Sequence, residues 1–270
     1  MTEHAGDKGF RVLFITQDDP FYVKLFFEEF FSHYQKLEEI TGVVMAAPMA
    51  KKSPYRLARQ MYDFYGPADF LRVGMRFAAY RALDAVSCLN PGNIPCSIKG
   101  LCGKYGIPVF NESRINSPEF LAKVRELAPD LIISVAAPVI FKKELIGIPR
   151  RGCINIHHGM LPRYRGMLPN FWQMYHGEER AGITVHELNE KLDDGRIILQ
   201  EDTPIDPEET LDNLISRTKR LGAHLMIKAI GLIRSGNLSY RENRSEEGSY
   251  FTFPTRRDAL EFRRKGKRIL

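Results

Sequence analysis

Short apolar runs alternate with amphipathic patterns along most of the chain, and this alternation predicts the fold class. The runs that are typical of strands are residues 10–16, 42–47, 108–110, 130–135 and 153–157. Apolar side chains recur at helical spacing in residues 21–35, 97–105 and 208–234, and the last stretch ends before Gly236. Strands that alternate with helices predict an α/β fold, in which helices cover a mostly parallel sheet on both faces.

The first strand leads directly into a helix. Asp19 and Pro20 stand at the start of the helical pattern. Because aspartate is a favoured N-cap and proline a favoured first helical residue, we expect the helix to begin there.

Residues 51–89 interrupt this rhythm with two helical patterns, at about 54–65 and 68–86, that are rich in Arg, Tyr, Phe and Leu. This helical insertion has three functional interpretations: it covers a substrate pocket, contacts a partner, or lies on a membrane surface. Apolar stripes most often belong to a core, so we expect it to pack against the sheet.

The last residues, 237–270, contain a β-type run at 249–255 and a cluster of arginines and lysines at 256–268. We expect the run to dock as a strand on the body. Charge runs are usually solvated, so we interpret the cluster as a basic tail whose deletion changes activity little.

Composition narrows the class of protein. The chain has 270 residues, 44% of them hydrophobic, which suits one large domain or one domain with a small appendage. The net charge of +6 permits phosphate or nucleic-acid partners, but both signs are interspersed before the tail. The cysteines Cys88, Cys96, Cys102 and Cys153 have no metal-type spacing. We expect reduced core thiols in a cytoplasmic protein without a secretory signal or membrane span.

Residues 151–199 hold the densest group of chemically capable side chains. Asn155 and His157 alternate with isoleucines in a strand, so they should project from one face near its carboxyl end. Residues 161–166 then reverse the chain, and a second β-type run at 183–186 leads to an acidic turn at Asp193. An amide, an imidazole and a carboxylate are expected to converge at the carboxyl ends of the strands, where such sheets bind ligands.

Several motifs occur in order: N-I-H-x-G-x-L-P-x-Y-R-G at 155–166, P-x-x-W at 169–172, G-I-T-V-H at 182–186 and L-D-x-G-x-I at 192–197. Together they resemble the formyltransferase family that uses 10-formyltetrahydrofolate. The resemblance implies a Rossmann-like catalytic domain over 1–203, with the insertion at about 51–89, and then a C-terminal helix and short basic tail over 204–270. It also implies 10-formyltetrahydrofolate as formyl donor and a catalytic triad of Asn155, His157 and Asp193.

Formyl transfer to an amine needs these three side-chain types. The reaction passes through a tetrahedral oxyanion, which an amide N–H or a protonated imidazole stabilises. The attacking nitrogen loses a proton and the leaving nitrogen gains one, so a carboxylate beside the imidazole helps to relay protons. We expect Asn155 and His157 in the first role and Asp193 in the second.

The neighbouring polar residues are expected to have less direct roles in the reaction. His158 should face away from His157 and serve packing, and His186 should support the site through a hydrogen bond. Asp194 is a weaker candidate than Asp193 for the catalytic carboxylate. A metal site of His157, His158 and Asp193 is disfavoured, because adjacent residues of a strand point apart.

The resemblance also places the donor and the acceptor. The pterin ring would lie on Ala137, Pro138, Val139 and Ile140, with Leu188 and Asn189 on its other side. Arg165 is a candidate for phosphate contacts, or equally for a bond that holds its own loop.

The acceptor is expected to be a small amine, and the first choice is an amino sugar on a nucleotide. Residues 16–20 lack the glycine-rich phosphate loop of the purine-pathway members, and residues 237–270 are too few for the barrel of the tRNA-formylating members. We therefore disfavour tRNA as partner. Formylation of initiator methionyl-tRNA, a formyltetrahydrofolate hydrolase and a basic RNA-binding module remain alternatives, whereas a dinucleotide oxidoreductase lacks its G-x-G-x-x-G. A homodimer is also considered.

Overall fold

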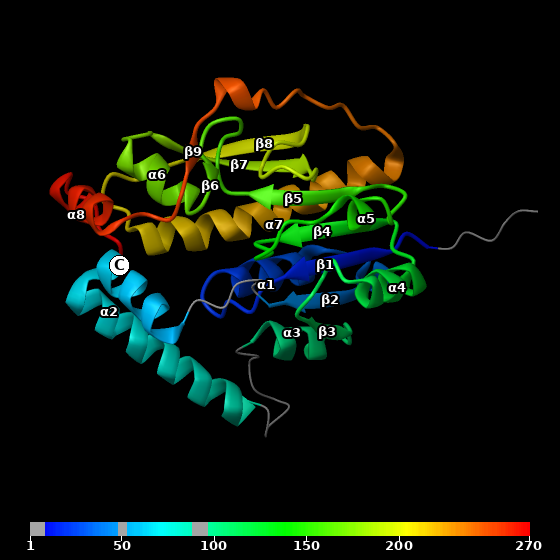
Figure 1. The fold of residues 1–270 in the computed structure, drawn as a ribbon, viewed down its shortest axis with the longest axis horizontal. Helices are drawn as coiled ribbons and strands as arrows, with labels where there is room; N and C mark the ends of the chain where they lie inside the picture. The colour runs from blue at the N-terminus through cyan, green and yellow to red at the C-terminus, as the bar shows by residue number, and fades with distance from the viewer. Residues whose placement is uncertain (1–8, 48–52, 88–96) are drawn as a thin grey trace, which may run out of the picture.

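The computed structural model describes residues 9–47, 53–87 and 97–270, and a seven-stranded sheet forms its centre (Figure 1). The strand order is β3-β2-β1-β4-β5-β7-β8. The strands are β1 Val12–Thr16, β2 Ile40–Ala46, β3 Val109–Glu112, β4 Leu131–Val135, β5 Cys153–His157, β7 Arg180–Glu187 and β8 Ile197–Pro204. β3, β2, β1, β4 and β5 run parallel, β7 is antiparallel to β5, and β8 is antiparallel to β7. The expected α/β class is confirmed.

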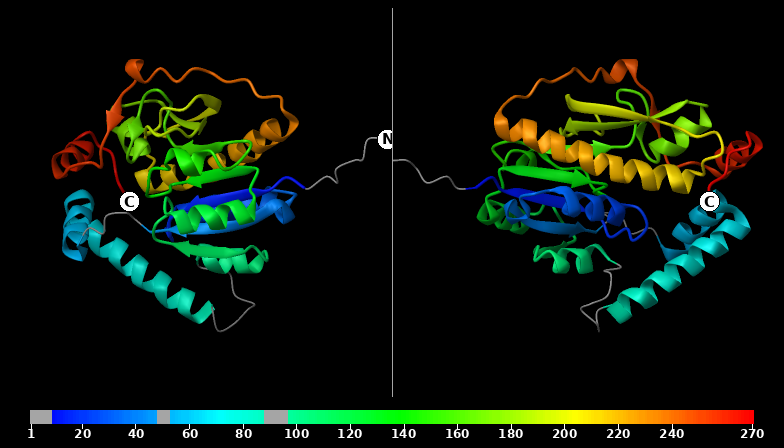
Figure 2. Two further views of the ribbon diagram at one scale, coloured as in Figure 1. Left: turned by 45° about the vertical axis from the view of Figure 1, so that its right-hand side comes forward. Right: turned by 180° about the vertical axis from the view of Figure 1, so that it is seen from behind.

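Helices cover both faces of the sheet (Figure 2). α1 (Val23–His33), α3 (Ile98–Lys104) and α7 (Leu211–Ser235) share one apolar cluster with the sheet, and α7 ends at Gly236 as expected. α4 (Pro118–Leu127) and α5 (Lys143–Ile146) pack on the other face. Every residue of β1 and β4 is buried, because both of their faces are covered.

The first helix begins later than expected. α1 starts at Val23, and Asp19 and Pro20 belong to the turn before it. Asp19 Oδ1 accepts the backbone N–H groups of Phe21 and Tyr22 at 2.8 and 3.2 Å, so the carboxylate stabilises this turn rather than the helix end. A short 3₁₀ helix, Leu37–Glu39, then precedes β2.

The hairpin partner β8 was not expected from the sequence. Its later positions are polar: Gln200 and Glu201 are only partly buried and Asp202 is exposed, because β8 is the last strand of the sheet. The apolar periodicity of a strand is therefore lost over half its length.

The insertion forms α2 (Pro54–Ser87), which breaks at Gly66 (φ 72°) into the two expected helices. The expected packing on the sheet is wrong for the second of them: Leu71 is 64% exposed, and Met75 and Leu83 are each 58% exposed. The first helix is anchored through Phe64, which is buried against Phe171. In Figure 1 the second helix projects away from the sheet.

The C-terminal residues pack on the body, so the interpretation as a solvated tail is wrong. The segment runs over β7 and β8 (Figure 1), through a 3₁₀ turn at Ser245–Glu247, to β9 (Tyr250–Phe251). β9 confirms a short part of the expected strand, and it pairs with β6 (Arg165–Gly166) beside α6 (Pro169–Tyr175). α8 (Arg256–Arg264) buries Ala259 and Phe262. Three of its arginines are exposed, whereas Arg263 donates to Phe64 O and Tyr65 O of α2.

Every helix in the described residues is too short or too polar to cross a membrane.

Candidate active site

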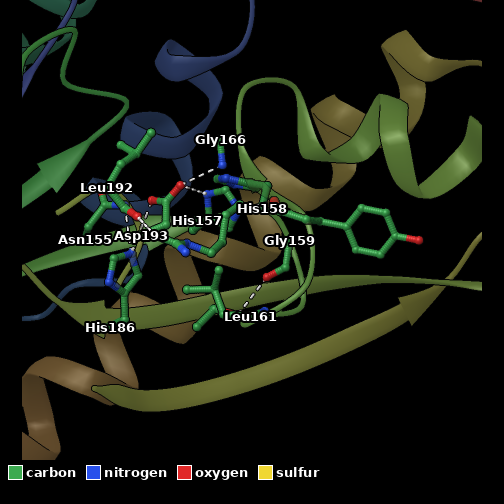
Figure 3. A network of polar contacts seen from close by, with 12 residues as sticks. Asn155, His157, His158, Gly159, Leu161, Gly166, His186, Leu192 and Asp193 are labelled. Atoms are coloured by element: carbon green, nitrogen blue, oxygen red, sulfur yellow. Dashed lines mark hydrogen bonds and ion pairs between the residues drawn. The ribbon is translucent and has the colours of Figure 1, made fainter. Parts of the chain in front are cut away.

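The candidate catalytic side chains project from one face at the carboxyl end of β5. Ile154 and Ile156 belong to the apolar cluster with α1 and α7, whereas Cys153 belongs to the cluster on the opposite face. Asn155 and His157 alternate with the isoleucines, so they share the face of Cys153. Figure 3 shows both side chains turned toward Asp193, which comes from the turn between β7 and β8.

His157 is held in one orientation by a backbone carbonyl. Its Nε2 lies 2.7 Å from Tyr164 O and therefore carries the proton of that bond. Its Nδ1 lies 3.6 Å from Asp193 Oδ2. Gly159 permits this arrangement, because a Cβ there would stand 2.7 Å from His157 Nε2 and 2.9 Å from Tyr164 O. Nδ1 is therefore the ring nitrogen that faces the carboxylate.

Two other segments of the chain hold Asp193 by hydrogen bonds. Asp193 is buried and has a left-handed backbone (φ 50°). Its Oδ2 accepts the N–H of Gly166 at 2.9 Å. Asn243 Nδ2 donates to Asp193 O at 2.9 Å and to Gly195 O at 3.0 Å, which ties the C-terminal segment to the acidic turn.

Asn155 is oriented by His186 on the neighbouring strand. Asn155 Nδ2 and His186 Nε2 are 3.1 Å apart, and His186 Nδ1 donates to Glu187 O at 2.7 Å. Burial lowers the pKa of His186 to about 4, although Asp193 Oδ1 at 3.7 Å opposes the shift. The imidazole is therefore neutral near pH 7, and Nε2 accepts one amide N–H of Asn155. The supporting hydrogen bond expected of His186 is present.

Asp194 and Arg165 hold the loop around the site. Arg165 Nη2 donates to Leu192 O at 2.5 Å and lies 3.7 Å from Asp194 Oδ1. Asp194 Oδ2 also accepts from Asn189 Nδ2 at 3.3 Å. These contacts favour the loop-holding interpretation of Arg165 over the phosphate contact.

His158 lies on the other face of the sheet, as expected. It is buried against α7, where its Nε2 would stand 3.2 Å from a Cβ at Gly222. His157, His158 and Asp193 therefore do not converge on one point.

The residues expected to hold the donor lie on the same face as Asn155 and His157. Ala137, Val139 and Leu188 pack against the apolar cluster that contains Cys153. Pro138 is half-buried, Ile140 is 49% exposed, and Asn189 Oδ1 accepts the N–H of Lys191 at 2.9 Å. The two loops thus offer apolar surface with adjacent backbone polar groups, the kind of site that binds a planar heterocycle.

Sequence reasoning missed the residues that hold the site from a distance. Asn243 contacts Asp193 across 50 positions, and Ser249 Oγ accepts the N–H of Tyr164 at 2.9 Å. Neither residue stands in a recognisable motif. The free, buried thiols Cys102 and Cys153 agree with expectation, while Cys88 and Cys96 lie outside the described residues.

Comparison with known proteins gives matches to formyltransferases. The family model described as formyl transferase matches residues 87–230. Among curated proteins, the methionyl-tRNA formyltransferase of Syntrophus aciditrophicus (strain SB) is 38% identical over 163 residues, which cover 60% of this chain and 52% of the relative. The chain thus spans about half the length of the curated relatives it matches.

Solved structures share the fold. A sugar N-formyltransferase from Shewanella sp. FDAARGOS_354 has a TM-score of 0.58 at 20% identity, covering 95% of this chain and 87% of that one. An N-formyltransferase from Helicobacter canadensis, in complex with folinic acid and dTDP-3-aminofucose, has a TM-score of 0.57 at 16% identity, covering 90% of this chain and 71% of that one. Because its family model matches more than half of the sequence, the chain belongs to the formyl transferase family.

Proposed function

We propose that this protein transfers the formyl group of 10-formyltetrahydrofolate to the amino group of a small acceptor. The observation that carries the proposal is the convergence of Asn155, His157 and Asp193 at the carboxyl end of β5, with Asn155 and His157 each oriented by a further hydrogen bond. Membership in the formyl transferase family supports the reaction class.

The geometry gives each group a role. The amine nitrogen attacks the formyl carbon, and one N–H of Asn155 remains free of His186 to stabilise the oxyanion. His157 Nδ1, which is not engaged by Tyr164, exchanges protons with the reacting groups beside Asp193. When the tetrahedral intermediate collapses, the bond from carbon to the folate nitrogen breaks. The proton lost by the amine then reaches that nitrogen.

The residues present fit a folate donor. When bound, 10-formyltetrahydrofolate supplies an activated formyl group. Ala137, Val139 and Leu188 would contact its ring, and the polar groups of the loops at Pro138–Ile140 and Asn189 would orient it.

For the acceptor we propose an amino sugar on a nucleotide. The proposal is supported by the fold similarity to sugar N-formyltransferases over nearly the whole chain, and by the dTDP-3-aminofucose bound to the Helicobacter canadensis relative. Initiator methionyl-tRNA is the second candidate, because the curated relatives at 38% identity carry that name.

A screen of acceptors tests the proposal. The purified protein is mixed with 10-formyltetrahydrofolate and a panel of nucleotide-linked amino sugars, methionyl-tRNA or no amine, and tetrahydrofolate release is followed by absorbance. We expect release with at least one amino sugar, and none with the His157→Gln variant. Efficient formylation of methionyl-tRNA alone would identify tRNA, and not an amino sugar, as the acceptor. Tetrahydrofolate release without any amine would indicate a hydrolase.

A further inference from the structure

The second half of α2, residues 68–87, has an apolar outer face that the described parts of the chain leave exposed. At about 3.6 residues per turn, this face is an arc about 140° wide in which no polar residue of 68–87 falls. It holds Leu71, Met75 and Val86, each more than half exposed, with glycine and alanines between them. A stripe of this width is typical of the side by which a helix packs, yet here it faces solvent.

The charges of α2 are separated by sign. All five arginines between residues 53 and 87 are exposed, whereas all three aspartates are half-buried. By helical spacing, Arg72 and Arg81 flank the apolar arc, one on each side. The outer face therefore combines apolar surface with positive charge and presents no exposed carboxylate.

The opposite side of the helix holds it on the first βα turn. The rings of Phe77 and Tyr80 lie 6.3 and 6.4 Å from the ring of Phe21, which follows β1. The carboxyl ends of β1 and β5 lie at the same edge of the parallel sheet. A flat surface that contacts the outer face therefore lies about 10 Å, one helix diameter, from that edge.

We propose that the outer face of α2 binds the surface of a bilayer that contains anionic phospholipids. Leu71, Met75 and Val86 enter the boundary between headgroups and acyl chains, while the flanking arginines contact the headgroup phosphates. The helix then lies in the plane of the bilayer surface and does not cross it. The inference is independent of the proposed function, because α2 contains none of the proposed catalytic residues.

The charges favour a bilayer over two other occupants of such a face. A second copy would set the same face against itself, and the arginines of both copies would meet without exposed aspartates beside them. A nucleic acid supplies phosphates for the arginines but offers no apolar layer to the arc. An anionic bilayer matches both the charge and the apolar surface.

Sedimentation with large unilamellar vesicles tests the inference. One set of vesicles consists of phosphatidylcholine, and the other of phosphatidylcholine and phosphatidylglycerol in equal parts. We expect the partition coefficient of the wild type to be at least about tenfold higher on the mixed vesicles, because the arginines are attracted to anionic headgroups. Added salt should weaken this binding.

Two double variants of the outer face separate its two contributions. Leu71→Gln with Met75→Gln should lower the partition coefficient on mixed vesicles at least about tenfold, because the acyl region no longer receives two apolar side chains. Arg72→Gln with Arg81→Gln should lower it by a similar factor, about tenfold, since each basic side chain adds to the attraction. Circular dichroism and thermal unfolding establish that both proteins are folded.

Matched controls change exposed positions outside α2. Leu260→Gln replaces an exposed leucine of the basic helix α8, and Arg114→Gln with Arg151→Gln removes the same charge as the arginine variant. Both controls should stay within about twofold of the wild type, because charges farther than a Debye length from the lipid are screened.

Three outcomes would overturn the inference. The first is that the wild type does not bind vesicles, or binds both kinds equally. The second is an equal loss of binding in the outer-face variants and the controls. The third is another occupant: a dimer in analytical ultracentrifugation that Leu71→Gln with Met75→Gln dissociates, or RNA binding that only the arginine variant loses.

Discussion

Each of the two histidines beside Asp193 gives one ring nitrogen to a backbone carbonyl. His157 Nε2 bonds to Tyr164 O, and His186 Nδ1 bonds to Glu187 O. The other nitrogen of each ring faces the Asp193 carboxylate, at 3.6 and 3.7 Å. Such carbonyl bonds fix the tautomer and orientation of a ring, so the site is oriented before any ligand binds.

Replacing any member of the triad should therefore reduce turnover strongly. We expect Asn155→Ala, His157→Ala and Asp193→Ala each to lower kcat by about a hundredfold or more, because each removes an electrostatic or proton-transfer group. Tetrahydrofolate release measures the rates, and circular dichroism checks folding. The double variants should lose little more than the single ones, since the groups act as a unit. Near wild-type turnover in any single variant would disprove the role assigned to that residue.

Gly159→Ala tests the orientation of His157 without changing the ring. The added Cβ would stand 2.7 Å from His157 Nε2, so the ring must move from Tyr164 O. We expect at least about a tenfold loss of kcat, because small displacements of catalytic groups are costly. Gly103→Ala is the control, since a Cβ there meets nothing within 4 Å. Equal turnover in both variants would contradict the required geometry.

The buried neutral histidines should make stability depend on pH. Burial depresses the pKa of His186 from 6.5 to about 4, and that of His158 also falls well below 6.5. The unfolded chain binds more protons below pH 6.5, so the free energy of unfolding should fall as pH decreases from 6.5 toward 4. Each histidine contributes up to about 1.4 kcal/mol per pH unit in that window.

Urea unfolding at about pH 7.5, 6.5, 5.5 and 5.0 measures the effect. His186→Gln should show a shallower decline than the wild type, whereas His176→Gln, which changes an exposed side chain, should keep the wild-type slope. Parallel curves for all three proteins would show that His186 is not held neutral by burial.

Among the elements, the C-terminal segment, residues 237–270, contacts several parts of the site. β9 pairs with β6, and Trp172 Nε1 donates to Thr252 O at 3.0 Å. Deletion of residues 237–270 would also remove the partners of Tyr164 and Asp193. The expectation that this deletion changes activity little is therefore replaced by a prediction of lost activity.

Asn243→Asp separates positioning from bulk packing. The change keeps the size but places a carboxylate against the carbonyls of Asp193 and Gly195, which need a donor. We expect kcat to fall at least about tenfold as the acidic turn shifts, with a much smaller change in donor KM. Asn237→Asp, at an exposed position of the same segment, is the matched control. A fall in melting temperature without a change in kcat would show that Asn243 has only a structural role.

At the scale of the whole molecule, the second half of α2 contributes little to the core. Figure 2 shows it projecting from the body in both views. Its contacts to the body are few and near the first βα turn, such as Arg76 Nη1 to Asp212 Oδ1 at 2.9 Å and the ring of Phe77 beside Phe21. The homodimer that was considered from the sequence stays a prediction, which light scattering tests directly.

Substitutions along α2 should reveal this uneven anchoring. Leu71→Gln with Met75→Gln should change the free energy of unfolding by less than about 1 kcal/mol, because both side chains are exposed. Phe64→Ala should cost about 3–5 kcal/mol, since Phe64 is 2% exposed. Chemical denaturation measures both. A large loss in the double variant that depends on protein concentration would indicate that this face is covered in an oligomer.

The sequence by itself determined the features that depend on local pattern. Apolar periodicity predicted the parallel strands and the helices between them, because each strand and helix shows its own repeat of buried positions. The alternation in β5 placed Asn155 and His157 on one face, and the ordered motifs indicated the family.

Tertiary structure decided what depends on distant contacts. The solvent exposure of α2, the packing of α8 and the start of α1 were not visible in local pattern, since an apolar stripe is the same whether or not a partner covers it. Likewise Asn243 reaches Asp193, and Lys219 reaches His158, only because the fold brings separate segments together. The spacing of residues along the sequence does not reveal such contacts, although these contacts set the orientation of the site.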